Sequence, residues 1–231
     1  MISVQAQIQQ PAPPALREGS RNVRYGDWNY PSNLDDAAAI TMALWYRGTL
    51  KPSDKVAVAV IGSRRCSEAG QKRAFKLGYQ LAQEGVTVVS GLALGADAAT
   101  HRGALAAGGR TFAVMGTGIN HVYPDVHEDL AEEIESSGAL FSQFLPAFPG
   151  SGRSFVKRNH VIAALSQVLI AVEGAPRSGS SAAVRAAIGQ GRPVGLLRSL
   201  VDSQDWARQL VESGQAFPVK SLDDVMGRLS F

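Results

Sequence analysis

The chain has 231 residues, of which 45% are hydrophobic and 19% charged, and this ordinary composition excludes wholesale disorder. Its apolar runs, such as Val56–Ile61 and Val168–Val172, are too short to cross a bilayer, and its single cysteine excludes a disulfide framework and a cysteine-based zinc site. The net charge of +3 permits binding to a polyanion without demanding it. The single cysteine leads us to expect a cytoplasmic protein, and the short apolar runs lead us to expect no membrane association.

The amino-terminal segment differs in character from the rest of the chain. Residues 1–26 are rich in Gln, Pro, Arg and Ser and lack apolar periodicity, so they predict a flexible leader. Residues 27–231 are expected to form a single domain with short extensions at both ends. Its first element is predicted to be a helix that starts near Asp35 and ends at the Gly48 turn, because the apolar residues in between suit one helical face.

From Val56 onward, apolar strands alternate with amphipathic helices. Strands are expected at VAVAVI, VTVVS, TFAVM, ALFS, VLIAVE and PVGLL, and helices around Ala74–Leu81, Ala98–Ala107, Val126–Ser136, Lys157–Leu165 and Ala182–Gly189. Strands and helices that alternate at this spacing are typical of βαβ crossovers and a parallel sheet that is buried on both faces. The sequence therefore predicts an α/β fold, Rossmann-like and doubly wound, with a mostly parallel sheet and helices on both faces.

Four glycine-containing turns are expected at the carboxyl ends of these strands. That edge of an open parallel sheet is where ligands bind, and the start of the following helix attracts anions. The candidates for a phosphate-binding site in these turns are Gly62, Ser63, Arg64, Gly91, Gly95, Gly116, Gly118, Ser178, Gly179 and Ser180. One such turn is usually a tight connection, but four on one edge favour an anion site whose glycines supply backbone N–H donors.

A basic and aromatic segment lies on the loop over residues 143–155 and the helix after it. Its candidate site residues are Arg153, Phe155, Lys157, Arg158 and Asn159. Cations interleaved with an aromatic ring are typical of single-stranded nucleic-acid sites, where the cations contact phosphates and the ring stacks on a base. The plain alternative is a helix start with solvated charges, in which Asn159 braces the loop rather than contacting a ligand.

Catalytic and cofactor chemistry has little support in the sequence. The first strand is followed by GSRRCSEAG instead of GxGxxG, and no GxxxxGK[ST] loop is present. The four histidines lack metal-ligand spacing, and Asp97 with Glu173 is a weak pair for hydrolysis. We therefore expect no metal, no cofactor and no catalytic residue. Cys66, which lies near a helix start without an evident partner, is expected to be an inert thiol.

Taken together, these motifs resemble the DprA/Smf family. The resemblance runs from about Tyr30 to Leu229 on the segments VAVIGSRRCSEAG, VVSGLALGADAATHRGAL, AVMGTGINHVYP, SFVKRNHVIAALS, VLIAVEGAPRSGSSAAVRAAI and QGRPV. It implies a sequence-independent single-stranded DNA binding protein, not an enzyme, that acts in DNA processing, recombination or natural transformation. It further implies a homodimer that loads a RecA-type recombinase. By resemblance, Arg64, Gly91, Gly95, Lys157, Arg158 and Asn159 map onto the family's DNA-facing pocket, with Phe155 beside it.

Three positions depart from the family pattern and change its charge. Leu94 and His160 stand where related sequences carry arginine, and Gln143 replaces the usual glutamate. His160 thus exchanges a permanent charge for one that depends on pH.

Two other functions stay open at this point. The first is a nucleotide-binding enzyme similar to Rossmann phosphoribohydrolases, although the PGGxGT motif with its downstream glutamate is missing. The second is a sensor that binds a small nucleotide in the same pocket. A purely structural scaffold would leave the clustered turns without a purpose.

Overall fold

The structure is a computed structural model that describes residues 15–28, 30–37 and 43–231. Its centre is a nine-stranded sheet in the order β1-β2-β6-β5-β4-β3-β7-β8-β9. The strands are β1 (Arg21–Arg24), β2 (Ala43–Gly48), β3 (Ala57–Ile61), β4 (Thr87–Ser90), β5 (Thr111–Val114), β6 (Ala139–Ser142), β7 (Val168–Ala171), β8 (Val194–Leu197) and β9 (Phe217–Val219). The helices are α1 (Glu68–Gln83), α2 (Ala96–Ala106), α3 (Glu128–Ser137), α4 (Gly152–Ala164), α5 (Gly179–Gly189), α6 (Arg198–Ser203), α7 (Asp205–Glu212) and α8 (Asp223–Met226), with 3-10 turns η1 (Ser32–Ala37), η2 (Pro52–Lys55) and η3 (Asp125–His127).

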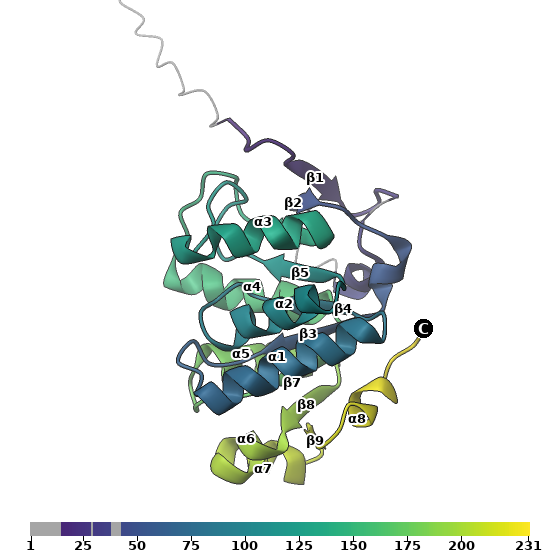
Figure 1. The fold of residues 1–231 in the computed structure, drawn as a ribbon, viewed down its shortest axis with the longest axis vertical. Coiled ribbons are helices and arrows are strands. Elements are labelled where there is room, and N and C mark those ends of the chain that lie inside the picture. The colour runs from purple at the N-terminus through teal and green to yellow at the C-terminus, as the bar shows by residue number, and fades with distance from the viewer. Residues whose placement is uncertain (1–14, 29, 38–42) are drawn as a thin grey trace, which may run out of the picture.

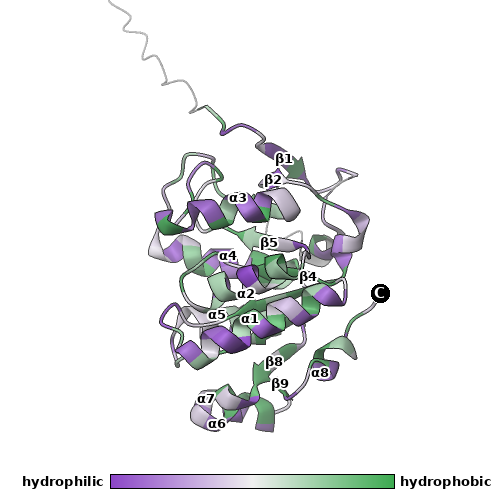
Figure 2. Cartoon of the chain, in the orientation of Figure 1, coloured by the Kyte–Doolittle hydropathy of each residue, from purple (hydrophilic) through white to green (hydrophobic). Residues whose placement is uncertain are grey.

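The predicted Rossmann-like α/β fold is confirmed. Every pairing from β6 through β5, β4, β3, β7 and β8 to β9 is parallel, and helices lie on both faces of the sheet (Figure 1). Alternation along β3 shows how both faces are buried: Ala57 and Ala59 pack in a core cluster with α4 and α5, while Val58 and Val60 pack in another with α1. Strands β8 and β9 are accordingly green in Figure 2, whereas purple lies on the edge strand β1 and on α1 and α3.

The amino-terminal part of the fold differs from the prediction. Residues 21–24 are not a flexible leader, because they form β1, which pairs antiparallel with β2 and buries Val23 completely. The helix predicted up to Gly48 is wrong over β2, where Leu44 and Tyr46 alternate into the core in the period of a strand. Residues 1–14, and residues 38–42 of the predicted helix, lie outside the described residues.

Helix α4 begins earlier than predicted, at Gly152, so that Arg153 and Phe155 are helical and not in a loop. The reason is a capping interaction: the Ser151 hydroxyl accepts a hydrogen bond from the Ser154 N–H at 3.2 Å. None of the helices in the described part of the chain is long and apolar enough to span a lipid bilayer.

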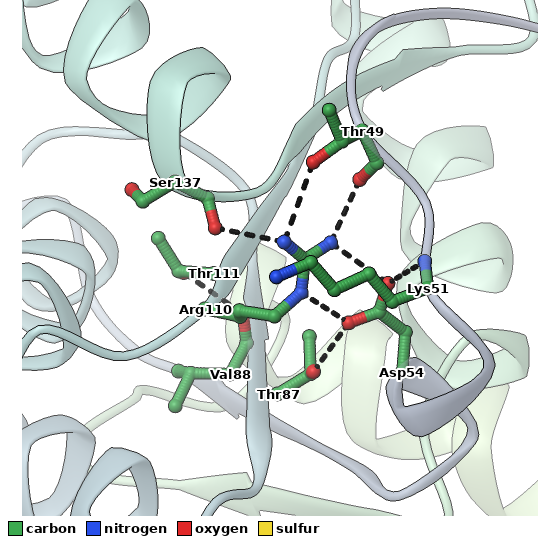
Figure 3. Close-up of polar contacts among 8 residues, drawn as sticks. All are labelled: Thr49, Lys51, Asp54, Thr87, Val88, Arg110, Thr111 and Ser137. Atoms are coloured by element: carbon green, nitrogen blue, oxygen red, sulfur yellow. Dashed lines mark hydrogen bonds and ion pairs between the residues drawn. The ribbon is translucent and has the colours of Figure 1, made fainter.

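A buried ion pair ties together the amino ends of the strands, at the edge opposite the glycine turns (Figure 3). Arg110 Nε and Nη2 donate to the two Asp54 carboxylate oxygens at 2.6 and 2.8 Å. The same guanidinium donates to the carbonyl oxygens of Thr49 and Ser137 at 2.7 and 3.1 Å, and Asp54 also accepts from the Thr87 hydroxyl at 2.9 Å. The network therefore joins the starts of β4, β5 and β6 to the end of β2.

Candidate functional site

A cavity of about 450 Å³, here called the strand-end pocket, lies beyond the carboxyl end of β3 and against α4 and the start of α5. The chain runs from β3 outward to β4, β5 and β6 and then returns to β7 on the other side of β3, so β3 and β7 flank a topological switch point. Open parallel sheets bind ligands at such points. Of the residues predicted from the sequence, the structure brings together Gly62, Ser63, Arg64, Phe155, Arg158, Asn159, Ser178, Gly179 and Ser180 around this pocket.

Phe155 and Tyr123 form an aromatic ledge beside the strand-end pocket. Their ring centroids are 5.3 Å apart, and the exposed Arg64 holds its guanidinium carbon 5.1 Å from the Phe155 centroid. Tyr123 is 49% exposed, so its ring is accessible to a ligand. The ledge thus offers a stacking surface next to a cation. Tyr123 was missed as a candidate, although its position after β5 in the motif GTGINHVYP was a usable signal.

The start of α5 supplies polar groups to the same pocket. The Ser178 hydroxyl accepts from the Ser181 N–H at 3.2 Å and lies 2.8 Å from the Ser180 hydroxyl. Asn159 Nδ2 donates to the Gly179 carbonyl oxygen at 3.2 Å, so Asn159 braces the first turn of α5. The positive end of the α5 dipole therefore points at the pocket, an arrangement that favours an anion.

Arg158 lies beneath the pocket surface. It is 5% exposed, and its guanidinium donates to the carbonyl oxygens of Gly91 and Val114, where β4 and β5 end. Burial lowers the pKa of Arg158 to about 10, and the neighbouring buried carboxylate of Asp97 opposes this shift. Arg158 is therefore cationic at neutral pH and fixes two strand-end turns. This position corrects the interpretation of Arg158 as a direct phosphate contact.

Three of the predicted glycines serve close packing. A side chain at Gly91 would collide with the Arg158 guanidinium, and one at Gly116 would collide with the Phe155 ring. Gly95 has a φ of 77° and lies against the backbone of the β3 turn. These glycines let the turns approach each other closely enough to form the pocket.

The expectation that the glycine turns present free N–H donors is wrong for two of them. The Gly118 N–H donates to the Phe148 carbonyl oxygen at 2.7 Å, and the Gly62 N–H donates to the Asp97 carboxylate. Both donors are therefore occupied inside the protein.

Arg153 and Lys157 lie away from the pocket. They are exposed, one helical turn apart on α4, and neither is among the described residues that line the pocket. His160 is also exposed on α4. The outer face of α4 is thus a second basic surface next to the pocket, and Leu94, 46% exposed, lies at the ledge.

The Cys66 thiol is expected to be unreactive. Burial raises its pKa to about 12, and the charge of Glu173 adds to the rise. At about pH 8 we expect alkylation by iodoacetamide to be roughly a thousandfold slower than for a cysteine with a pKa of about 8.5. Unfolding in guanidinium chloride should restore the ordinary rate, and rapid alkylation of the folded protein would contradict this environment.

Comparisons with known proteins identify relatives over most of the chain. The family model described as DNA recombination-mediator protein A matches residues 21–230. Protein Smf of Escherichia coli is 35% identical over 205 residues, which cover 87% of this chain and 54% of that protein, so the chain spans about half of its length. DprA of Streptococcus pneumoniae is 35% identical over 204 residues, which cover 87% of this chain and 72% of that protein.

Two solved structures resemble the whole fold. The X-ray structure of the Streptococcus pneumoniae DprA has a TM-score of 0.83 at 33% identity and covers 93% of this chain and 76% of that one. A structure of DprA from Helicobacter pylori, which concerns that protein's single-stranded DNA binding mode, has a TM-score of 0.79 at 27% identity and covers 90% of this chain and 94% of that one.

Proposed function

Because the chain belongs to the DNA recombination-mediator protein A family, also called DprA/Smf, we propose that it binds single-stranded DNA without sequence preference in the strand-end pocket. The Helicobacter pylori relative, with its single-stranded DNA binding mode, supports this ligand class. The proposal concerns this chain, which spans only part of several relatives.

The observation that carries the proposal is the stacking of Arg64 on the aromatic ledge at the topological switch point. A nucleotide strand presents a charged phosphate and a flat base at each step. Arg64 and the start of α5 suit the phosphate, and the rings of Phe155 and Tyr123 suit the base. Neither contact reads a base edge, so the binding is expected to tolerate any sequence.

Two exposed cations on α4 are placed to contact phosphates where the strand leaves the pocket. Arg153 and Lys157 share the outer face of α4, beside Gly152 and Val156 on the pocket wall. Together with Arg64 they give about three phosphate contacts, which corresponds to a slope of log affinity against log salt of about −2.

We extend the proposal to the biological setting implied by the family. The protein acts by binding rather than catalysis, in the cytoplasm, in DNA processing, recombination or natural transformation. We propose further that it works as a homodimer, whose two linked sites raise avidity for one strand, and that it loads a RecA-type recombinase.

The test is fluorescence anisotropy with oligothymidylate over a range of salt concentrations. Arg64→Ala is expected to weaken binding and to make the salt slope less negative by about 0.7, because one phosphate contact is lost. Phe155→Leu should cost about 1–3 kcal/mol of affinity and leave the slope unchanged, since stacking is not electrostatic. The exposed Arg102 of α2 provides the matched control, Arg102→Ala, which should behave as wild type.

Thermal-shift measurements with nucleotides and an assay for base release separate the proposal from its rivals. Stabilisation by a mononucleotide, with no binding of oligonucleotides, would identify a small-ligand sensor. Release of a free base from a nucleoside monophosphate would identify a phosphoribohydrolase-like enzyme.

A further inference from the structure

A second cationic cavity lies outside the strand-end pocket. It has a volume of about 460 Å³ and is bounded by the flank of α1 and by the carboxyl ends of β8 and β9. Its cations are Arg73, Lys76, Arg198 and Lys220, and the described residues that line it include no carboxylate. We call it the basic groove. Its apolar lining is aliphatic, so it has no ring on which a base could stack.

Two carboxylates near the basic groove form ion pairs with its cations, and a third, Asp224, interacts with the charge of Lys220 without a direct ion pair. Arg73 lies 3.5 Å from Glu173, and Arg198 lies 2.8 Å from Asp202. The Asp224 carboxylate accepts hydrogen bonds from the backbone N–H groups of Lys220 and Ser221 at 2.8 and 2.9 Å.

No ion pair within the described part of the chain includes the ammonium group of Lys76 or of Lys220. Both side chains are exposed and come from separate elements, α1 and the turn after β9. Their positive charge is therefore available to an external anion.

The topology places the basic groove on the same edge of the sheet as the strand-end pocket. Strands β3, β7, β8 and β9 are parallel neighbours, so their carboxyl ends meet at one edge. Adjacent strands are about 4.8 Å apart, which separates the ends of β3 and β8 by roughly 10 Å. Between the two cavities, Glu173 after β7 accepts from the Ser67 N–H at 2.9 Å and lies against Arg73.

We propose that the basic groove binds the phosphodiester backbone of the single strand that occupies the strand-end pocket, and so lengthens the DNA footprint toward β9. This inference rests on the proposed function. Phosphates are the part of the strand that the groove suits, because it combines free ammonium groups with an aliphatic floor. Lys76 and Lys220 are binding residues for the part of the strand that has already passed Arg64 in the strand-end pocket.

The test compares a short and a long oligothymidylate, of about 5 and about 15 nucleotides, which span the usual range of single-strand site sizes. Lys76→Gln combined with Lys220→Gln is expected to weaken binding of the long strand roughly tenfold and to make its salt slope less negative by about 1.4. Binding of the short strand, which fills only the strand-end pocket, should be unchanged. Lys51→Gln with Lys55→Gln removes the same charge at the opposite edge of the sheet and is the matched control.

Acetylation of lysines, read by mass spectrometry, provides a second measurement on the unaltered protein. The long strand should protect Lys76 and Lys220 several-fold, and the short strand should protect neither. Three outcomes would contradict DNA binding by the basic groove and leave the proposed function standing: equal loss of affinity for both strands, unchanged binding of the long strand, or unprotected lysines. Failure of the unaltered protein to bind either strand would overturn the proposed function and the groove together.

Discussion

Replacing Arg110 with methionine is expected to lower the free energy of unfolding by about 3 kcal/mol, because it leaves the Asp54 carboxylate buried without its cation. Asp54 is 8% exposed, and methionine keeps most of the length of the arginine side chain. The variant also loses the hydrogen bonds from the guanidinium to Thr49 and Ser137 (Figure 3). The loss therefore reaches the network that joins the starts of β4, β5 and β6 to the end of β2.

Urea unfolding monitored by circular dichroism measures this effect, and the melting temperature should fall by about 6–12 °C for a chain of this size. The matched control is Arg198→Met, which breaks an ion pair with Asp202 whose side chains are 59% and 55% exposed. That exposed pair should contribute less than about 1 kcal/mol. If both variants lose the same free energy of unfolding, burial does not explain how much the ion pair between Arg110 and Asp54 contributes to stability. At low temperature Arg110→Met should still bind DNA, because the network lies at the edge opposite the strand-end pocket.

The fold from β3 to β8 could be predicted because its signal is local, whereas β9 and the helices α6, α7 and α8 were not predicted. Buried parallel strands are short apolar runs, and four of them, β3, β4, β5 and β7, are followed by a glycine-containing turn and a helix. The pairing of β1 with β2 could not be predicted in this way. It depends on contacts between segments far apart in the chain, and the alternation of Leu44 and Tyr46 was hidden among apolar residues that also suit a helix.

The candidate site was predictable in outline for a topological reason. Residues after parallel strands meet at one edge, so Arg64, Ser178 and Ser180 could be placed together without any contact being known. The direction of each side chain could not be derived. Arg158 has the same chemistry as Arg64 but points inward, because the carbonyl groups that end β4 and β5, and the Asp97 carboxylate, form its partners only in the folded chain.

Replacing Arg158 with methionine is expected to cost about 3–5 kcal/mol of stability and to abolish tight DNA binding. The substitution leaves Asp97 buried without its cation and leaves the carbonyl oxygens of Gly91 and Val114 without their donor. The turns after β4 and β5 then lose the group that joins them beneath Phe155. Gly91→Ala should weaken DNA binding as well, because the added methyl group displaces the same guanidinium.

The pH dependence of the free energy of unfolding tests whether the unpaired Asp97 carboxylate causes the stability loss in Arg158→Met. Burial raises the pKa of Asp97, and Arg158 opposes that rise in the unaltered protein. An acid whose folded pKa exceeds its unfolded value binds a proton more readily when folded, so its penalty is present above the folded pKa and is relieved as pH falls through it. In Arg158→Met the pKa rises further. The destabilisation of this variant should therefore be fully present at neutral pH and should diminish as the pH is lowered.

The double variant Asp97→Asn with Arg158→Met separates the loss of the ion pair from a simple loss of packing. Asparagine keeps the shape of Asp97 and its hydrogen bond from the Ala93 N–H, but it carries no charge to leave unpaired. The double variant should therefore be more stable at neutral pH than Arg158→Met alone, with a coupling energy of about 1–3 kcal/mol and no recovery on acidification. Urea unfolding of the wild type, both single variants and the double variant at neutral and acidic pH measures both quantities. If the single and double variants share one pH profile, another group titrates, and Arg158 acts by filling space rather than by compensating the Asp97 charge.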